Sequence, residues 1–365
     1  MKFSKQVILA RFHKMPTLHF EDQQLTSFGG VIVFQALFKR LRLKARLKGC
    51  FQHLKGSPIF GVHRIVLLLI VHLLLGFRRL RDVDYYRDDP MVLRLLGLRR
   101  LPNVATISPT LAHLDRPSVE QVRRLSCDLV TEGLVQESLA RLTLDFDGSV
   151  LSTQRRAEGT AVGYNPKKKG NRSYYPLFCT VAQTGQFFDV HHRPGNIPDS
   201  NGAHLFMMDC FDRMRDAFPH IVLESRMDSA FFDQKTLTLM DLYGIECTAS
   251  VPFERFPILK QMIESRQRWT PLTEERSYFE SDWKPTSWPA PYRFLFVRHK
   301  VQRQGKEPLQ LDLFEPRDFD YDYRVVVTNK MASASSVLLF HQGRGSQEGV
   351  FAEAKQHAGL DLIPT

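Results

Sequence analysis

The succession of strand-like and helix-like segments after Leu142 constrains the fold of this chain most. LTLDFD alternates like a strand, and YPLFCTVAQ and QFFDVHHRP have the pattern of a hairpin that turns at Thr184 and Gly185. Helix-like and strand-like stretches then alternate, in the order Ser200–Phe218, HIVLESRMD, Asp233–Leu242, ECTASVP and Phe256–Arg268. Three strands followed by alternating helices and strands predict an α/β core, in which helices flank a mixed sheet.

The N-terminal part of the chain is basic and has a helical pattern. Residues 1–100 contain 19 Lys and Arg but 6 Asp and Glu, a surplus of 13 positive charges. The remaining residues contain 31 and 33, a balance of −2, so the net charge of +11 comes from the N-terminal part. Apolar residues recur at helical spacing among the basic ones, as at Leu37, Leu41 and Ala45. We expect a helical domain over residues 1–140 that binds a polyanion. DNA is the leading candidate for this polyanion and an anionic membrane surface is the second. The alternative is a solvated basic helical bundle that binds neither.

The short helices of this domain have candidate start signals. Ser108 could cap a helix with Pro109 at its first position, and Ser118 could cap the next. The apolar run Ile65–Phe77 is shorter than the about 20 residues that a membrane-spanning helix needs, so we expect a buried helix there. Five widely spaced cysteines without a CxxC pair indicate reduced, packed thiols rather than disulfides or a zinc site.

Residues 269–335 have a different composition from the segments on either side. They contain all three tryptophans and the strand-like runs YRFLFVRHKV, PLQLDLFEP and YDYRVVVTN. We expect a β-rich insertion at 269–335 that divides the core into a first part at 141–268 and a last part at 336–365. The pattern from Arg344 to His357 is again helical.

Three carboxylates occupy positions from which they could meet. Asp147 lies at the end of the first core strand, Asp228 lies at the end of a later strand, and Glu348 lies in the last helix. Strand ends on one sheet edge converge, and a helix across that edge can add a third carboxylate. Such a cluster can hold two divalent metal ions about 4 Å apart, which activate the attacking oxygen and stabilise the leaving oxygen of a phosphodiester. The alternative is that these acids lie in exposed turns or caps, as most do.

The motifs around these acids resemble those of the DDE transposases of bacterial insertion sequences, in the group whose core is interrupted by a β-rich insertion. The matching blocks are LDFDGS, GYNPKKKG, YPLF and RPGN, followed by RMDSAFF. The last block of that family is a tyrosine, an arginine three residues on, a glutamate four beyond and a lysine seven beyond that. Here the block has His341 in place of the tyrosine, then Arg344, Glu348 and Lys355.

This resemblance implies an RNase H-like core and a fold class of α/β, with Asp147, Asp228 and Glu348 as catalytic metal ligands. The cofactor would be Mg²⁺ or Mn²⁺, as two ions. Asp145 shares a strand face with Asp147 and is an alternative first ligand; we favour Asp147 because Gly148 and Ser149 follow it as in the family. The expected partners are double-stranded DNA, as terminal inverted repeats and target, and a second copy of the chain, in the bacterial cytoplasm and without a membrane.

Several residues are candidates for contact with DNA. Arg344 and Lys355 could hold phosphates near the metal ions, although a salt bridge on a helix is the alternative role. The basic loop with its neighbouring aromatic ring could bind backbone and stack on a base, or could be a solvated loop; it consists of Lys167, Lys168, Lys169, Arg172 and Tyr174. Trp288, with Trp283, could stack on a flipped base, although packing in a β-domain is the more common role of tryptophan.

Family members continue past the glutamate helix, so we expect this chain to be a C-terminally truncated copy. The function expected is metal-dependent cleavage of insertion-sequence ends and their transfer to target DNA. The alternatives are an inactive remnant that only binds DNA and a nuclease that hydrolyses DNA without strand transfer.

Overall fold

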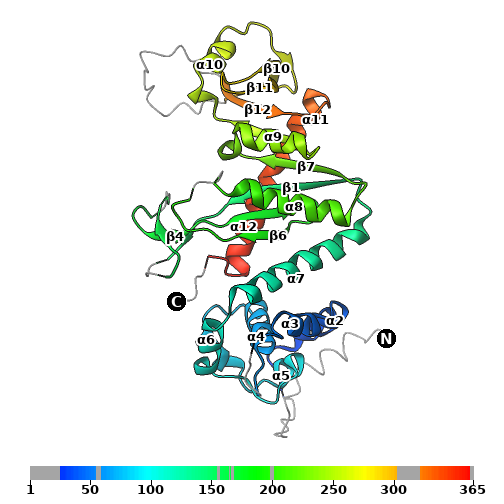
Figure 1. Ribbon diagram of the computed structural model, residues 1–365, viewed down its shortest axis with the longest axis vertical. Helices are drawn as coiled ribbons and strands as arrows, with labels where there is room; N and C mark the ends of the chain where they lie inside the picture. Colours follow the sequence, from blue (N-terminus) through cyan, green and yellow to red (C-terminus); the bar gives the residue numbers. More distant parts are fainter. Residues whose placement is uncertain are drawn as a thin grey trace, which may run out of the picture.

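The computed structural model describes residues 25–54, 59–153, 157–163, 165, 168–197, 201–301 and 321–361. The molecule is elongated, with a helical N-terminal domain at one end, a sheet with helices in the middle and the β-rich strands at the other end (Figure 1). Lys167 and the strand-like run PLQLDLFEP lie outside the described residues.

Short helices form the N-terminal domain around a core of their own. The apolar run predicted to be a buried helix is α4, whose Ile65, Leu67 and Leu68 are 1% exposed or less, so that prediction is confirmed. No described helix is long and apolar enough to cross a membrane. The elements are η1 (Gly29–Val31), α2 (Ile32–Arg40), α3 (Leu43–Cys50), α4 (Val62–Leu74), η2 (Leu80–Tyr86), α5 (Pro90–Leu96), α6 (Val104–Ala112), α7 (Arg116–Leu134) and η3 (Val135–Glu137).

The caps predicted for α6 and α7 are wrong. Asn103 caps α6 by accepting a hydrogen bond from the Thr106 N–H, and Asp115 caps α7 by accepting one from the Ser118 N–H. Both residues precede the predicted serines and offer the side-chain oxygen that a helix start favours. Pro109 therefore lies inside α6 rather than at its beginning.

Nine strands form one sheet among the described residues, in the order β6-β5-β1-β7-β8-β12-β11-β10-β9. β6, β5 and β1 pair antiparallel, whereas β1, β7 and β8 pair parallel. These five strands are the mixed sheet of an RNase H-like core, which confirms the predicted fold class. The core strands are β1 (Arg141–Gly148), β5 (Leu177–Val181), β6 (Gln186–His191), β7 (Val222–Met227) and β8 (Glu246–Val251).

The strands of the β-rich segment continue this same sheet. β12 pairs antiparallel with β8, and β11, β10 and β9 follow outward. β10 is absent from the predicted strands because its sequence, RSYFESDW, has Phe279 as its one buried residue and shows no clear apolar face. The bounds are β9 (Thr270–Pro271), β10 (Arg276–Trp283), β11 (Tyr292–Lys300) and β12 (Tyr321–Thr328).

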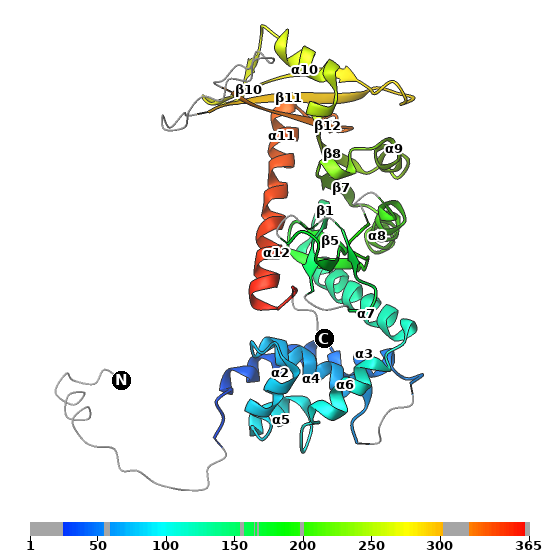
Figure 2. The ribbon, with the colours of Figure 1, turned by 90° about the vertical axis from the view of Figure 1, so that its left-hand side faces the viewer.

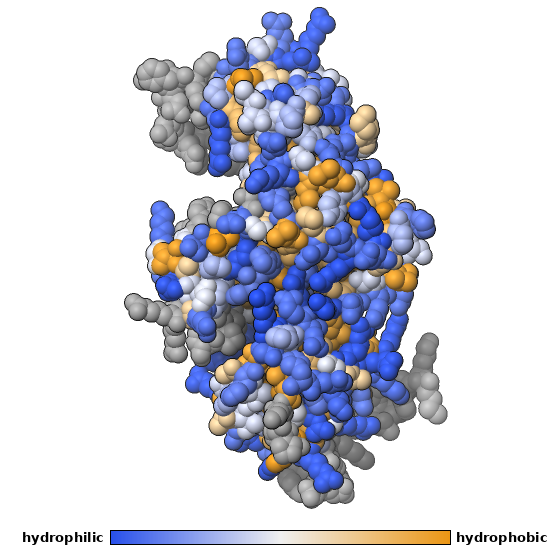
Figure 3. Space-filling model, viewed as in Figure 1, coloured by the Kyte–Doolittle hydropathy of each residue, from blue (hydrophilic) through white to orange (hydrophobic). Residues whose placement is uncertain are grey.

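Helices cover both faces of the sheet (Figure 2). On one face, Phe146 of β1 packs against Phe206 and Phe211 of α8, beside α9 and α10. Apolar side chains reach the surface over α8 and α9, where Leu205 and Leu242 are exposed (Figure 3). The opposite face is covered by α11 and α12, joined by η6. The bounds are α8 (Ala203–Ala217), α9 (Gln234–Leu242), α10 (Pro257–Glu264), α11 (Ala334–Gln342), η6 (Gly343–Gly345) and α12 (Ser346–His357).

Candidate active site

Asp147 and Asp228 lie side by side at the ends of two neighbouring parallel strands. The register of β1 and β7 pairs Asp145 with Arg226, so Asp147 is level with Asp228, which directly follows β7. Strand periodicity places Asp145, Asp147 and Arg226 on the face that α11 and α12 cover, while Phe146 points into the core on the other side. The two predicted aspartates are therefore neighbours on one sheet edge.

Arg344 bridges the two aspartates from the joint between α11 and α12. Its Nη2 atom lies 3.2 Å from Oδ2 of Asp147 and 3.5 Å from Oδ2 of Asp228. The two carboxylate oxygens can therefore be no farther apart than the sum of these distances. The other oxygen of Asp228 accepts a hydrogen bond from the Ala230 N–H at 2.9 Å. The three side chains are 18–32% exposed, so solvent and ligands can reach this group.

Asp145 has a different environment from Asp147. It is 1% exposed, and the Arg226 guanidinium donates to both of its oxygens, from Nε at 2.9 Å and from Nη2 at 2.5 Å. Burial raises the pKa of Asp145, and the Arg226 guanidinium opposes this shift. Arg226 also donates to the Phe340 carbonyl at 3.3 Å, which ties the ion pair to the end of α11. Both oxygens of Asp145 are thus engaged by a buried cation.

Glu348 lies in the first turn of α12, four residues after Arg344, and is exposed. Its neighbour Gln347 is buried and anchors the helix, because its Nε2 donates to the Asp145 carbonyl at 3.2 Å and to Thr180 Oγ1 at 2.9 Å. Among the described residues no three His, Cys, Asp or Glu side chains are close enough to hold a metal ion together. The structure thus brings Asp147 and Asp228 together at one guanidinium, and among the described residues Glu348, one helical turn beyond Arg344, does not join them in a group of three.

His341 occupies the position of the family's tyrosine and is held against β8. Its two ring nitrogens lie 3.0 Å from Thr248 Oγ1 and 3.0 Å from Ser250 Oγ. Burial, together with the nearby cations Arg344, Arg226 and Arg324, lowers the pKa of His341 to about 4. His341 is therefore neutral at neutral pH and forms part of the packing behind Arg344.

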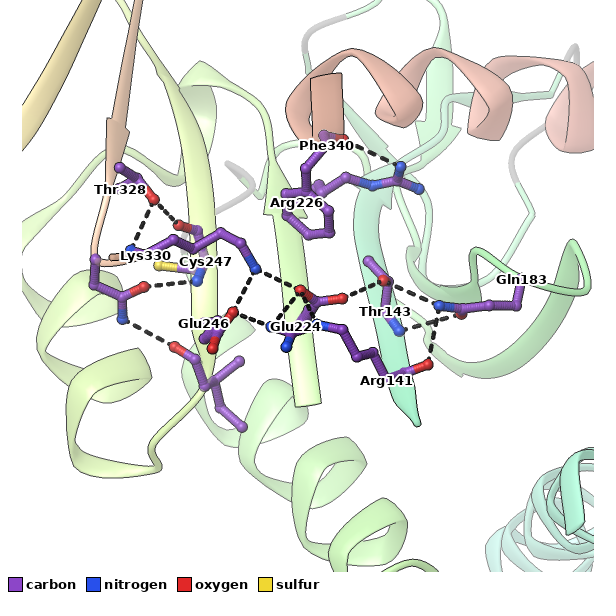
Figure 4. A network of polar contacts seen from close by, with 12 residues as sticks. Arg141, Thr143, Gln183, Glu224, Arg226, Glu246, Cys247, Thr328, Lys330 and Phe340 are labelled. Atoms are coloured by element: carbon purple, nitrogen blue, oxygen red, sulfur yellow. Dashed lines mark hydrogen bonds and ion pairs between the residues drawn. The ribbon is translucent and has the colours of Figure 1, made fainter. Parts of the chain in front are cut away.

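A buried ionic network fixes the strand that returns from the β-rich segment (Figure 4). Lys330, which is 5% exposed, forms ion pairs with Glu224 and Glu246, and Arg141 pairs with the same two carboxylates. The Lys330 Nζ atom also lies 4.3 Å from the centre of the Phe340 ring, whose other neighbour is the Arg226 guanidinium at 5.5 Å. This network links β12 and the end of α11 to the strands that carry the aspartates.

The predicted basic loop belongs to a small sheet formed by β2 (Leu151–Ser152), β4 (Arg172–Tyr174) and β3 (Ala161–Val162). Lys168 and Lys169 are exposed there. Arg172 and Tyr174 have internal partners instead: Arg172 donates to Thr160, and the Tyr174 hydroxyl donates to the Glu158 carbonyl.

The blocks GYNPKKKG and RPGN each contain a glycine at a close backbone contact, Gly163 in the first and Gly195 in the second. A Cβ on Gly163 would lie 1.9 Å from the Gly195 carbonyl oxygen, and a Cβ on Gly195 would lie 2.3 Å from Ser173 Oγ. The loop and the turn therefore pack backbone against backbone, which side chains at these positions would prevent.

Trp288 and Lys355 were both predicted to contact DNA. Trp288 is 7% exposed and packs against Phe232 and Tyr292, which is the packing role considered for it. Lys355 lies toward the end of α12, with its Nζ atom 6.0 Å from the centre of the Phe351 ring. The Trp288 side chain is therefore part of the hydrophobic core.

Sequence reasoning missed Arg226 and Gln347. Arg226 had a usable signal, because it lies two residues before Asp228 and the strand period places both on one face. Gln347 had none, since its role depends on the contact of α12 with β1 and β5. All five cysteines are free and buried, as predicted.

Asp147 and Asp228 have the chemistry that a divalent metal ion requires. Hard carboxylate oxygens are the ligands that Mg²⁺ prefers, and the guanidinium between the two aspartates shows that positive charge is accommodated there. Gln347 Oε1 is a buried acceptor without a hydrogen-bond partner among the described residues. The residues present therefore fit a cation held by two carboxylates.

Two solved transposase structures are similar to this chain at low sequence identity. The piggyBac transposase in a synaptic complex with hairpin DNA is 13% identical, with a TM-score of 0.47 over 88% of this chain and 68% of that chain. Mos1 transposase in a pre-cleavage transpososome is 10% identical, with a TM-score of 0.22 over 62% and 69% of the two chains. A comparison with curated proteins finds no significant match. The model of the transposase DDE domain group 1 matches residues 10–365, and the chain therefore belongs to this family of DNA transposases.

Proposed function

We propose that this transposase cuts the ends of a bacterial insertion sequence and joins them to target DNA. The observation that carries the proposal is the pair of aspartates at the ends of β1 and β7, both within reach of one cation, the Arg344 guanidinium. Asp147, Asp228 and Glu348 would be the catalytic residues and the ligands of two Mg²⁺ or Mn²⁺ ions.

Each side chain would have a distinct part in the reaction. Asp147 and Asp228 would hold metal from adjacent strands, and Glu348 would complete the set from α12. The metal ions would supply an activated attacking oxygen, first of water and then of the 3′-hydroxyl, and would offset the charge that develops on phosphorus. Asp145 is not needed as a ligand, because Arg226 occupies both of its oxygens.

DNA would bind to basic residues around Asp147 and Asp228. Arg344 and Lys355 would contact phosphates near the reacting bond, and the exposed Lys168 and Lys169 would contact the backbone from the small sheet. The basic helical domain would bind the terminal inverted repeats, and two copies of the chain would hold the two ends of the element.

The test is cleavage and joining of element-end DNA by the purified chain in Mg²⁺. Asp147→Asn, Asp228→Asn and Glu348→Gln should each abolish both steps. Glu353→Gln is the matched control, since it changes an exposed acid of the same helix and should leave cleavage intact. Cleavage that persists in all three variants would contradict the proposal. Joining of pre-cleaved ends separates a transposase from a simple nuclease.

A second candidate function is DNA binding without cleavage. The observation that favours it is the separation of Glu348 from the two aspartates, since the described residues contain no group of three carboxylates able to hold a metal ion. It predicts salt-sensitive binding that is unchanged by the same three substitutions, and no product in any metal.

A further inference from the structure

Arg344 is held loosely in the site. One nitrogen, Nη2, contacts both aspartates at 3.2 and 3.5 Å, whereas close charge-assisted bonds are about 2.7–2.9 Å. Its Nε is buried and has no hydrogen-bond partner among the described residues. Arg226, by contrast, donates from two nitrogens to two oxygens of Asp145, at 2.9 and 2.5 Å. Of these two arginines on the same face, Arg344 is the one that can leave its carboxylates at low cost.

We infer that Arg344 is the counterion of Asp147 and Asp228 until a divalent cation binds, and that it then exchanges these carboxylates for a phosphate of the DNA. The inference rests on the proposed function. It adds that Arg344 couples the binding of the metal ion to the binding of DNA.

The shared carboxylate oxygens favour this exchange. Hard carboxylate oxygens are the ligands that a divalent cation such as Mg²⁺ prefers. A divalent cation held by Asp147 and Asp228 would use carboxylates that the Arg344 guanidinium already contacts through Nη2. Two positive groups at one position repel each other, so the metal and Arg344 compete for the carboxylates.

The local backbone permits the displacement. Arg344 lies in η6, a 3₁₀ turn between α11 and α12, and such a turn within a helical segment often marks a hinge. Gly343 is pressed against the Arg226 guanidinium, whereas a Cβ at Gly345 would meet nothing within 4 Å. The turn is thus packed tightly just before Arg344 and has open space beside Gly345 just after it, before Gln347 anchors α12.

The destination of the guanidinium follows from its chemistry. A planar guanidinium pairs with two phosphate oxygens at once, and Arg344 would regain in this way the hydrogen bonds that it lacks in the site. Metal binding would thus release a DNA-binding group, and DNA would in turn favour the metal by the same factor.

The test is metal affinity in the absence of DNA, measured as free Mn²⁺ by electron paramagnetic resonance on the full chain. Arg344→Gln removes the competitor and should tighten Mn²⁺ binding about tenfold, and Arg344→Lys should act in the same direction but less. Arg324→Gln is the matched control, because it removes an exposed arginine whose field reaches His341; it should change the affinity less than about twofold. Unchanged or weaker Mn²⁺ binding in Arg344→Gln would overturn the inference while leaving the proposed function intact.

Two further measurements complete the design. Asp147→Asn should lose Mn²⁺ binding; if it does not, both the inference and the proposed ligand set are wrong. In the unaltered chain, Mg²⁺ should shift the Nε–Hε magnetic resonance signal that is missing from Arg344→Gln, and an unmoved signal counts against displacement. Mg²⁺ should also strengthen binding of a short DNA duplex to the unaltered chain more than to Arg344→Gln, and an equal gain would refute the coupling.

Discussion

Gly343 and Arg226 approach each other so closely that a Cβ on residue 343 would lie 2.1 Å from the Arg226 Nη1 atom. Arg226 cannot move aside easily, because it is buried and bonded to both oxygens of Asp145. The turn that carries Arg344 is therefore seated directly on the buried ion pair.

Gly343→Ala should destabilise the protein by about 1–3 kcal/mol, the usual cost of overpacking a tight contact. Urea unfolding measures the effect. Gly345→Ala is the control, since a Cβ there meets nothing within 4 Å and should cost little. Equal stability of the two variants would show that the contact is not as close as the structure has it.

Loss of charge at Asp145 should mainly lower stability, whereas loss of charge at Asp147 should mainly abolish activity. Asp145→Asn leaves the Arg226 cation buried without its partner and should cost about 3–5 kcal/mol in the free energy of unfolding. Asp147→Asn breaks a partly exposed pair and should cost at most about 1 kcal/mol, while abolishing DNA cleavage. The measurements are urea unfolding and the cleavage assay. A stable, inactive Asp145→Asn would make Asp145 the metal ligand instead.

His341 should make stability depend on pH. Its pKa in the folded protein is about 4, below its ordinary value of 6.5. Between these two pH values the unfolded chain is therefore protonated at His341 while the folded protein is not. Stability from this group is complete above pH 6.5 and falls as the pH drops toward 4, by up to about 3 kcal/mol. His341→Gln, which can still bond Thr248 and Ser250, should have a shallower pH dependence in this window. Parallel curves for the two proteins would mean that His341 is not buried.

Lys330 should matter more for stability than Arg141, although both pair with Glu224 and Glu246. The Lys330 side chain is 5% exposed and the Arg141 side chain 45%. Lys330→Met removes a buried cation and should cost about 3 kcal/mol, while Arg141→Met should cost about 1 kcal/mol or less. Urea unfolding of both variants decides this, and the reverse order would show that the surface arginine carries the network.

Local patterns were sufficient to predict the core elements but not their partners. Alternation in LTLDFD identified β1 and the side chains on each of its faces, and those faces are confirmed. The ion pair of Asp145 with Arg226 joins residues 81 positions apart, and it depends on the register of β1 with β7, which no short pattern encodes.

The position of Glu348 is set by contacts that no sequence pattern reveals. Its spacing from Arg344 places both residues on one side of a helix. How far that helix stands from the aspartates depends on Gln347, on the Gly343 contact and on the Phe340 ring between two buried cations. These are tertiary contacts of single residues, so the meeting of all three carboxylates remains a prediction.

The unbroken ladder from β6 to β9 makes the outer strands mechanically continuous with the strands that bear the aspartates. β12 is hydrogen-bonded to β8 over four residue pairs, from Val325 with Val251 to Thr328 with Thr248, and no linker separates them. The outer strands therefore cannot swivel as a separate lobe. A nucleic acid bound to the outer strands would therefore lie at a fixed distance from the carboxylates. Any movement that brings the two together would have to come from the DNA or from the helix that carries Glu348.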